Sequence, residues 1–209
     1  MKRIVMLWSV WLGLTACAPT EESAEHQSNT HQGHTRHEAM DLASASDQSL
    51  YQVESQWETQ TGQSLRLKNF AGKPTILAMV YASCKNACPR IIADMKRIQS
   101  DVDQKYPDQT QFVLVSIDPE VDTPERLAQL AQKSDLNGQW TLLRGTSEDV
   151  MELAALLGVK YRKTSDTDYA HSNVISLLNA QGEIQHRQEG LGTDPEQTLQ
   201  ALDKLYASP

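Results

Sequence analysis

Residues 74–90 read PTILAMVYASCKNACPR, and they place two cysteines four positions apart directly after a short apolar run. A continuous apolar segment of this length is typical of a strand that is buried on both faces of a parallel sheet. A helix is predicted to follow, because apolar residues then recur along one helical face, at Ile91, Met95, Ile98 and Val102. Cys84 is therefore expected at the end of a central strand, and Cys88 in the first turn of the next helix.

The same alternation of strands and helices continues along the chain. Strands are predicted at 112–117, 140–144, 173–178 and 183–188. Signals for helix ends are present at Thr123, Gly158 and Asp194. Helical crossovers imply parallel strands in the first half, and the Asn-Ala-Gln-Gly turn at 179–182 implies antiparallel strands at the end. This order predicts an α/β, thioredoxin-like three-layer fold with a central mixed β-sheet over residues 49–209, preceded by a disordered tether.

Composition limits the classes of function that are open to the chain. With 209 residues and ordinary apolar content, the sequence fits one globular domain with extra sequence at one end. The formal net charge of −8 argues against nonspecific nucleic-acid binding, which needs a cationic surface. No internal run is long and apolar enough to span a bilayer, and the domain is expected to be monomeric.

The first 17 residues have the features of a bacterial lipoprotein signal. Lys2 and Arg3 form a positive segment, and the apolar segment 4–14 is too short for an ordinary spanning helix. The sequence Leu-Thr-Ala-Cys then resembles the lipoprotein cleavage box, so residues 1–16 are predicted to be removed and Cys17 to carry the lipid. The mature chain is expected in the bacterial cell envelope, facing the periplasm from the inner or the outer membrane. A plain secretory signal with an incidental cysteine is the alternative.

Residues 17–48 are predicted to be a flexible linker between the lipid and the domain. They are mainly Glu, Ser, Thr, Gln, Ala and His, and such a composition buries too little apolar surface to offset the entropy of ordering. Histidines recur within it at intervals of three to five residues, at His26, His31, His34 and His37. They fit either a solvated low-complexity segment or one that captures copper and passes it to the folded domain.

Cys84 and Cys88 remain as the thiols of the domain once Cys17 is assigned to the lipid. Outside the cytosol they can form a structural disulfide, a redox couple or a soft-metal site. A structural disulfide would close a loop of few residues and stabilise little. Their spacing is one residue longer than the C-x-x-C of thioredoxin-type oxidoreductases, and Tyr81 stands where thiol peroxidases have a threonine. A thiol in the first turn of a helix is expected to have a lowered pKa, which suits both redox chemistry and metal binding.

A metal site needs a further ligand, and the domain contains two histidines. His186 lies among polar residues in the middle of a predicted strand and is expected at the surface. His171 is expected at the start of a strand, after a loop that passes beside the cysteine-bearing turn in a thioredoxin-like fold. Two thiolates and an imidazole suit Cu(I) in trigonal coordination, because soft sulfur selects soft copper. Cu(II) is possible with an added oxygen or nitrogen ligand, whereas zinc would want a fourth ligand.

Three motifs together resemble those of the Sco/SenC family of copper-binding, thioredoxin-like proteins. The motifs are Cys84-x-x-x-Cys88-Pro89, Ser116-Ile117-Asp118-Pro119-x-x-Asp122-Thr123-Pro124 and Tyr169-x-His171-Ser172, and the likeness runs from about Trp57 to Tyr206. The resemblance implies copper binding by Cys84, Cys88 and His171. It also implies a role in loading or maturing the dinuclear copper centre of a cytochrome c oxidase subunit, or of a related copper enzyme outside the cytoplasmic membrane.

Two positions depart from the family's pattern. The family usually has proline directly after the first cysteine, where this chain has Lys85, whose charge would favour the neighbouring thiolate. It usually has aspartate directly before the histidine, where this chain has Ala170, with Asp168 two positions further back. A carboxylate there could orient the imidazole. Asp118 and Asp122 are interpreted as residues of strand exit, turn and helix capping rather than of the site.

Two functions from different classes are compatible with these residues. As a copper chaperone, the chain would take up copper and pass it to a client by ligand exchange. As a thiol-disulfide reductase, it would keep the client's cysteines reduced, with Cys84 attacking, Cys88 resolving and His171 not essential. Copper delivery ranks first, and a sensor of copper or redox state is a third, weaker interpretation.

Overall fold

The computed structural model describes residues 48–136 and 138–207. The predicted signal peptide, Cys17 and the histidines of the linker lie outside the described residues. The helices are α1 (Ala87–Lys105), α2 (Pro124–Lys133), α3 (Ser147–Leu157) and α4 (Glu196–Ala207), with short 3-10 helices η1 (Leu50–Gln52) and η2 (Leu67–Phe70). The strands are β1 (Trp57–Thr59), β2 (Ser64–Leu65), β3 (Thr75–Val80), β4 (Gln111–Ser116), β5 (Trp140–Arg144), β6 (Tyr161–Lys163), β7 (Tyr169–His171), β8 (Val174–Leu178) and β9 (Ile184–Glu189).

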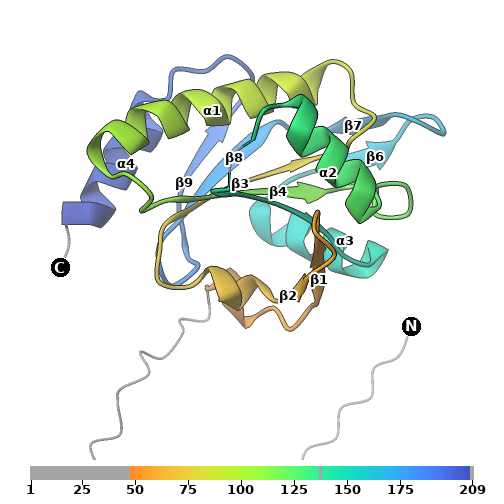
Figure 1. Ribbon diagram of the computed structural model, residues 1–209, viewed down its shortest axis with the longest axis horizontal. Helices are drawn as coiled ribbons and strands as arrows, with labels where there is room; N and C mark the ends of the chain where they lie inside the picture. The colour runs from red at the N-terminus through yellow and green to blue at the C-terminus, as the bar shows by residue number, and fades with distance from the viewer. Residues whose placement is uncertain (1–47, 137, 208–209) are drawn as a thin grey trace, which may run out of the picture. The chain divides into compact units, whose positions relative to one another are not determined.

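Within the described residues, a seven-stranded mixed sheet has the strand order β2-β1-β5-β4-β3-β8-β9. The inner strands β3, β4 and β5 run parallel, whereas β1, β8 and β9 pair antiparallel with their neighbours. In Figure 1, α1, α2 and α4 lie on one side of this sheet and α3 lies on the other. The expected thioredoxin-like, three-layer α/β fold with a central mixed sheet is therefore confirmed.

Apolar periodicity explains how α1 meets the sheet. All residues of β3 are buried, as expected for a central strand that is covered on both faces. The predicted stripe of α1 is buried as well, with Ile91, Met95, Ile98 and Val102 each at most 2% exposed. Burial of this stripe fixes the rotation of α1 about its axis, and with it the direction of Cys88 at the start of the helix.

Helix ends follow their sequence signals. Thr123 caps α2 by accepting a hydrogen bond from the Arg126 amide, and Pro124 occupies the first helical position, where no intrahelical amide is needed. α3 ends at Gly158, whose φ of 70° is the left-handed conformation that glycine adopts without strain. These boundaries agree with those that the sequence predicts.

Two local predictions are wrong. β3 ends at Val80, so Cys84 lies in the loop 81–86 rather than at the end of the strand. The strands β6 and β7 form a separate two-stranded hairpin, so His171 ends a short strand instead of starting the long strand β8. The hairpin residues are mostly polar and exposed, and they lack the apolar alternation by which a strand is recognised in a sequence.

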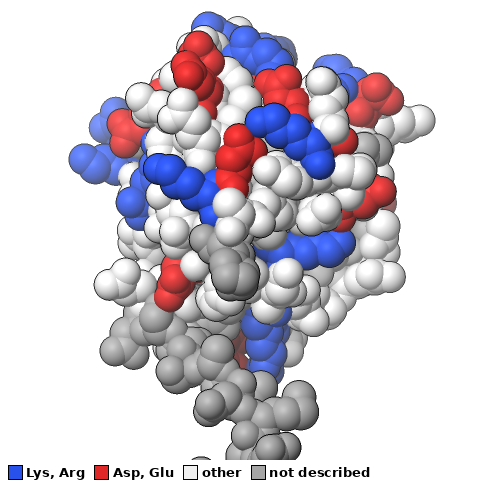
Figure 2. All heavy atoms as spheres, turned by 90° about the vertical axis from the view of Figure 1, so that its left-hand side faces the viewer, with Lys and Arg blue, Asp and Glu red and all other residues white. Residues whose placement is uncertain are grey.

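One face of the domain carries charged side chains of both signs. Figure 2 shows the side of the molecule that lies at the left in Figure 1, and acidic and basic side chains are interspersed over it. This face therefore offers no continuous area of one charge to a partner. No helix in the described part of the chain is long and apolar enough to cross a membrane.

Candidate metal centre

Cys84 and Cys88 approach each other where the loop after β3 enters α1. Cys88 is the second residue of α1 and is 1% exposed, whereas Cys84 lies in the loop and is half-buried. Both are free thiols. The backbone amide of Cys88 donates a hydrogen bond to the Cys84 sulfur at 3.2 Å. An amide that lacks an intrahelical partner at the start of α1 is therefore directed at the more exposed sulfur, where it stabilises a thiolate.

His171 reaches the cysteines from β7. Its Nε2 atom lies 3.8 Å from the sulfur of Cys88, although the two residues are 83 positions apart in the chain. Its Nδ1 atom lies 3.0 Å from the backbone carbonyl of Ser172. Because a carbonyl oxygen can only accept, Nδ1 carries the proton of the neutral ring, and the lone pair of Nε2 faces the sulfur. This tautomer is the one that can bind a metal ion through Nε2.

The three predicted ligand atoms are close enough for one metal ion. They lie within 4.8 Å of one another, and no further cluster of three Cys, His, Asp or Glu side chains with such geometry occurs in residues 48–136 and 138–207. Metal–ligand bonds of about 2.0–2.3 Å in a trigonal arrangement separate the ligand atoms by about 3.5–4 Å, so small movements close the site. Two sulfurs and one nitrogen form a soft set that suits Cu(I) and lacks the fourth ligand of a closed zinc site.

The two thiols differ in acidity. Partial burial opposes ionisation of Cys84, but hydrogen bonds from Cys88, from the Asn86 amide and from the Tyr81 hydroxyl outweigh it and lower the pKa of Cys84. Burial, together with the neighbouring Cys84, raises the pKa of Cys88 well above its ordinary value. The prediction of a lowered pKa for the thiol within the helix is therefore wrong, because burial outweighs the helix N-terminus. Lys85 is exposed, and hydrogen bonds rather than its charge account for the acidity of Cys84.

In the reduced, metal-free chain, iodoacetamide is expected to alkylate Cys84 at least about tenfold faster than Cys88, because thiolate is the reacting form and Cys88 is buried. The pH midpoint of the Cys84 reaction should lie below that of free cysteine, since its pKa is lowered. Trypsin cleaves after Lys85, so the two cysteines fall in different peptides and mass spectrometry can follow each one. Equal rates at the two positions would contradict the assignment of Cys84 as the acidic thiol.

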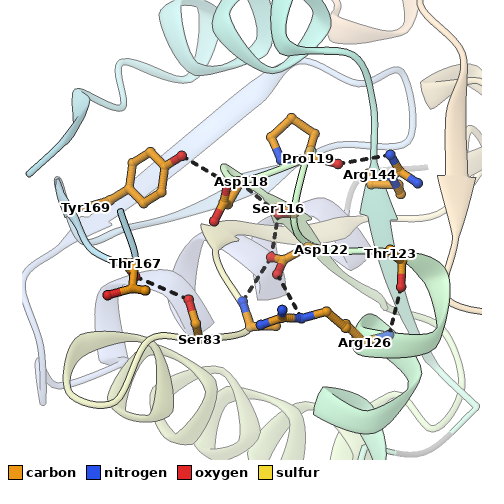
Figure 3. A network of polar contacts seen from close by, with 11 residues as sticks. Ser83, Ser116, Asp118, Pro119, Asp122, Thr123, Arg126, Arg144, Thr167 and Tyr169 are labelled. Carbon is orange, nitrogen blue, oxygen red and sulfur yellow. Dashed lines mark hydrogen bonds and ion pairs between the residues drawn. The ribbon is translucent and has the colours of Figure 1, made fainter. Parts of the chain in front are cut away.

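A buried carboxylate holds the cysteine loop to the sheet (Figure 3). Asp122 is fully buried, and its Oδ2 atom accepts hydrogen bonds from the Ala82 amide at 2.9 Å and from the Ser116 hydroxyl at 2.6 Å. Its Oδ1 atom has no hydrogen-bond partner among the described residues and lies 3.9 Å from Nε of Arg126. Burial raises the pKa of Asp122, although both donors act in the opposite direction. Asp122 does not cap α2, as Thr123 does, but fixes the loop that carries the cysteines.

Replacing Asp122 with alanine is expected to lower the free energy of unfolding by about 2–3 kcal/mol, because the Ala82 amide and the Ser116 hydroxyl lose a charged acceptor. Asparagine at this position is expected to cost less, since its amide oxygen can still accept both hydrogen bonds. Urea denaturation of the two variants measures the difference. A loss below about 0.5 kcal/mol in the alanine variant would mean that the carboxylate does not hold the loop.

Two tyrosines join the histidine hairpin to the cysteine loop. The hydroxyl of Tyr169 donates to Asp118 at 3.0 Å, and its backbone amide donates to the Tyr81 hydroxyl at 3.3 Å. Burial and the hydrogen bond with Asp118 raise the pKa of Tyr169 to about 12, so its hydroxyl stays protonated and remains a donor. The rings of Tyr81 and His171 meet edge to face, with centroids 5.9 Å apart. These contacts set the position of the imidazole relative to the sulfurs.

Asp168 does not take the orienting role that its place in the sequence suggests. Its carboxylate lies 3.4 Å from the hydroxyls of Ser165 and Thr167, within its own turn. The imidazole of His171 is oriented instead by the backbone carbonyl of Ser172. A backbone carbonyl fixes the tautomer as a carboxylate would, so the absence of aspartate directly before the histidine leaves this part of the centre intact.

The remaining candidate residues divide into those outside the centre and those that support it. His186 lies on β9, at the edge of the sheet and outside the three-residue cluster. Tyr81, Tyr169 and Asp122 support the cluster, and sequence analysis did not assign this role to them. The sequence gives one indication of the role of the two tyrosines: Tyr81 lies three positions before Cys84, and Tyr169 lies two positions before His171.

Comparison with known proteins gives one matching family model and several similar proteins. The SCO1/SenC family model matches residues 44–207. The human mitochondrial protein SCO1 homolog is 29% identical over 133 residues, which are 60% of this chain and 43% of that protein. A solved SCO1/SenC family lipoprotein from Bacillus anthracis is 25% identical, with a TM-score of 0.67 over 72% of this chain and 92% of that one. Bradyrhizobium japonicum ScoI, solved with copper bound, is 25% identical, with a TM-score of 0.56 over 74% and 97% of the two chains.

The likeness covers the folded domain rather than the whole length of the longer relatives. This chain spans 62%, 43% and 36% of the length of three curated relatives that it matches. The family match nevertheless includes every helix and strand described above, from η1 to α4. The cysteine loop and the histidine hairpin both lie within it.

Proposed function

Because the chain belongs to the SCO1/SenC family, we propose that it is a copper chaperone of the cell envelope that binds copper through Cys84, Cys88 and His171. It takes up copper, with Cu(I) favoured, and passes it to the dinuclear copper centre of a cytochrome c oxidase subunit or of a related enzyme. The Sco family consists of cytochrome c oxidase assembly proteins, and its member ScoI from Bradyrhizobium japonicum has been solved with copper bound. The convergence of two sulfurs and one imidazole nitrogen within 4.8 Å carries the proposal.

The burial of Cys88 and the contacts that hold His171 support release by ligand exchange that begins at Cys84. Cys88 is buried, and His171 is held by its contacts with Ser172 and Tyr81, so both bind from the protein side. Cys84 is half-buried, as His171 is, but it lies in the loop 81–86 rather than in a helix or strand. A client thiolate can therefore displace Cys84 first, while the other two ligands retain the metal until further client ligands arrive. Three-coordinate copper has room for an incoming ligand, so the transfer needs no free copper in solution.

A thiol-disulfide reductase is the second candidate, and the lowered pKa of the Cys84 thiol favours it. Cys84 has the lowered pKa of an attacking thiol, and Cys88 lies close enough to resolve a mixed disulfide. The Cys84 thiolate would attack a client disulfide and release one client thiolate. Cys88 would then release the second, and the Cys84–Cys88 disulfide would form as the client gains two electrons. Oxidised cysteines cannot bind copper, so this reaction would couple copper occupancy to redox state.

The two candidates give different products with the same client. The probe is the purified, metal-free copper domain of a cytochrome c oxidase subunit, prepared with its cysteines either reduced or oxidised. The copper-loaded chain is expected to transfer its copper to the reduced domain, which is measured after chromatographic separation. A reductase acts on the oxidised domain instead, and its Cys88→Ser variant accumulates a mixed disulfide through Cys84. Mixed disulfide formation without copper transfer by the unmodified chain would overturn the chaperone proposal.

We also propose that Cys17 carries a lipid and that residues 17–48 link this anchor to the domain. The Leu-Thr-Ala-Cys sequence supports the proposal, and the Bacillus anthracis relative is named a lipoprotein. Mass spectrometry of the chain extracted from membranes tests it directly. We expect an N-terminal residue 17 that bears the lipid mass. An unmodified chain with a different N-terminus would overturn the assignment.

A further inference from the structure

A groove between α1 and α2 begins at the cysteine pair. Its volume is about 490 Å³, and Ala82, Cys84 and Cys88 line one end of it. The α1 wall consists of residues whose spacing of three and four places them on one helical face: Pro89, Ile92, Ala93 and Lys96. The α2 wall has the same spacing: Arg126, Gln129, Leu130 and Lys133. The two walls therefore form a continuous channel that leads away from the more exposed thiol.

The rim of the groove is cationic, and none of the residues that line it is Asp or Glu. Two of its three cations have a carboxylate nearby: Lys96 lies 3.7 Å from the exposed Asp135, and Arg126 lies 3.9 Å from the buried Asp122. Lys133 is exposed and forms no ion pair with any described residue. The lining therefore presents a net positive charge to whatever enters the groove.

The sign of this charge is opposite to that of the chain as a whole, which has a formal net charge of −8. It also differs from the face in Figure 2, where charges of both signs alternate. A cationic lining beside a reactive thiol attracts an anionic partner and orients it before contact. The apolar side chains of Ile92 and Leu130 also line the groove, so it accepts apolar groups as well.

The dimensions of the groove fit a short extended peptide. From Cys88 to Lys96, α1 advances about 12 Å, at about 1.5 Å per residue. An extended chain advances about 3.3 Å per residue, so the groove takes about four residues. Successive side chains of such a segment point in opposite directions, so alternate side chains can face the apolar and cationic residues of the lining.

We propose that this groove binds an acidic, extended segment of the client polypeptide, next to the client thiol that exchanges with Cys84. The inference rests on the proposed function for the identity of the client, but the docking itself needs no copper. A segment bound in the groove holds its thiol beside the exposed member of the cysteine pair and so raises the effective concentration of the incoming ligand. Clients without acidic residues beside their thiols exchange more slowly.

Thiol-disulfide exchange with short peptides tests the docking without copper. The full-length chain is first oxidised to its Cys84–Cys88 disulfide. The peptide thiolate then attacks the Cys84 sulfur, so a mixed disulfide between the peptide and Cys84 forms and the Cys88 thiolate is released. The probes are the synthetic peptides Cys-Glu-Leu-Glu-Glu, Cys-Gln-Leu-Gln-Gln and Cys-Lys-Leu-Lys-Lys. Each second-order rate constant is compared between protein variants for the same peptide, so differences in peptide thiol pKa cancel.

The test variant and its control make the same change in charge at different places. The groove variant combines Gln129→Glu and Lys133→Glu, which change the charge of the α2 wall by −1 and −2, a total of −3. The control variant combines Gln63→Glu and Lys68→Glu. It changes the charge by the same total of −3, at residues that do not line the groove. All four side chains are exposed, so folding should be unaffected, and urea denaturation of each variant checks this.

The acidic peptide is expected to react about tenfold more slowly with the groove variant, and within about twofold of the unmodified rate with the control. The basic peptide should react faster with the groove variant. Equal effects of the two variants on the acidic peptide, or no effect of either, would overturn the docking proposal. Copper titration of the unmodified chain separates this outcome from the proposed function, because failure to bind copper would overturn the function and leave the peptide result standing.

Discussion

The Cys84→Ser/Cys88→Ser variant is expected to lose the equimolar copper site completely. Serine keeps the approximate shape of each side chain but replaces a soft sulfur with a hydroxyl oxygen, which competes poorly for Cu(I). Of the three converging ligands, only the imidazole of His171 would remain. The measurement is an anaerobic Cu(I) titration of the reduced chain against a chromogenic chelator, in which the unmodified chain should take up an equimolar amount. Equimolar binding of unchanged affinity in the variant would place the metal elsewhere.

His171→Ala is expected to weaken copper binding by more than about 100-fold, because loss of a direct ligand should exceed the 10–100-fold effect of losing a group that orients one. Binding is not abolished, since both sulfurs remain. Copper transfer to a reduced client should fall with the affinity, whereas reduction of an oxidised client should persist, because the imidazole takes no part in thiol exchange. The same chelator titration, followed by the two client reactions, measures all three effects.

Two control variants make the result for His171 specific. His186→Ala removes an imidazole on β9, outside the cluster, and should bind copper as the unmodified chain does. Ser172→Ala keeps the backbone carbonyl that orients the ring of His171 and should do the same. Unchanged affinity in His171→Ala would mean that Nε2 is not a ligand. The two sulfurs would then have to be explained by thiol exchange.

The elements that hold large apolar side chains could be predicted from the sequence, because burial imposes a local pattern on each of them. The predicted strand 140–144 coincides with β5, and the buried stripe of α1 is the one that its spacing predicts. Gly158 ends α3 in the left-handed conformation that its residue type suggests. The order of these elements then restricts the topology, since helical crossovers require parallel strands and tight turns antiparallel ones.

The approach of His171 to Cys84 and Cys88 is predicted by the expected fold and the family resemblance. No local pattern predicts the contacts around the cysteines, because they join segments that are far apart in the sequence. The sulfur of Cys88 meets the ring of His171 across 83 residues, and Asp122 binds the Ala82 amide across 40. The hairpin that carries the imidazole is polar and exposed, so no local pattern marks it. The acidity of the two thiols depends on burial and on Tyr81, neither of which a spacing of cysteines reveals.

X-ray absorption at the copper K edge tests the convergence of the three side chains most directly. The sample is the reduced chain loaded with an equimolar amount of Cu(I). We expect a coordination shell of two sulfurs and one nitrogen, with outer scattering from an imidazole ring that disappears in His171→Ala. A shell of two sulfurs alone, with a spectrum that the substitution of His171 leaves unchanged, would contradict the proposal that Cys84, Cys88 and His171 hold a single copper ion.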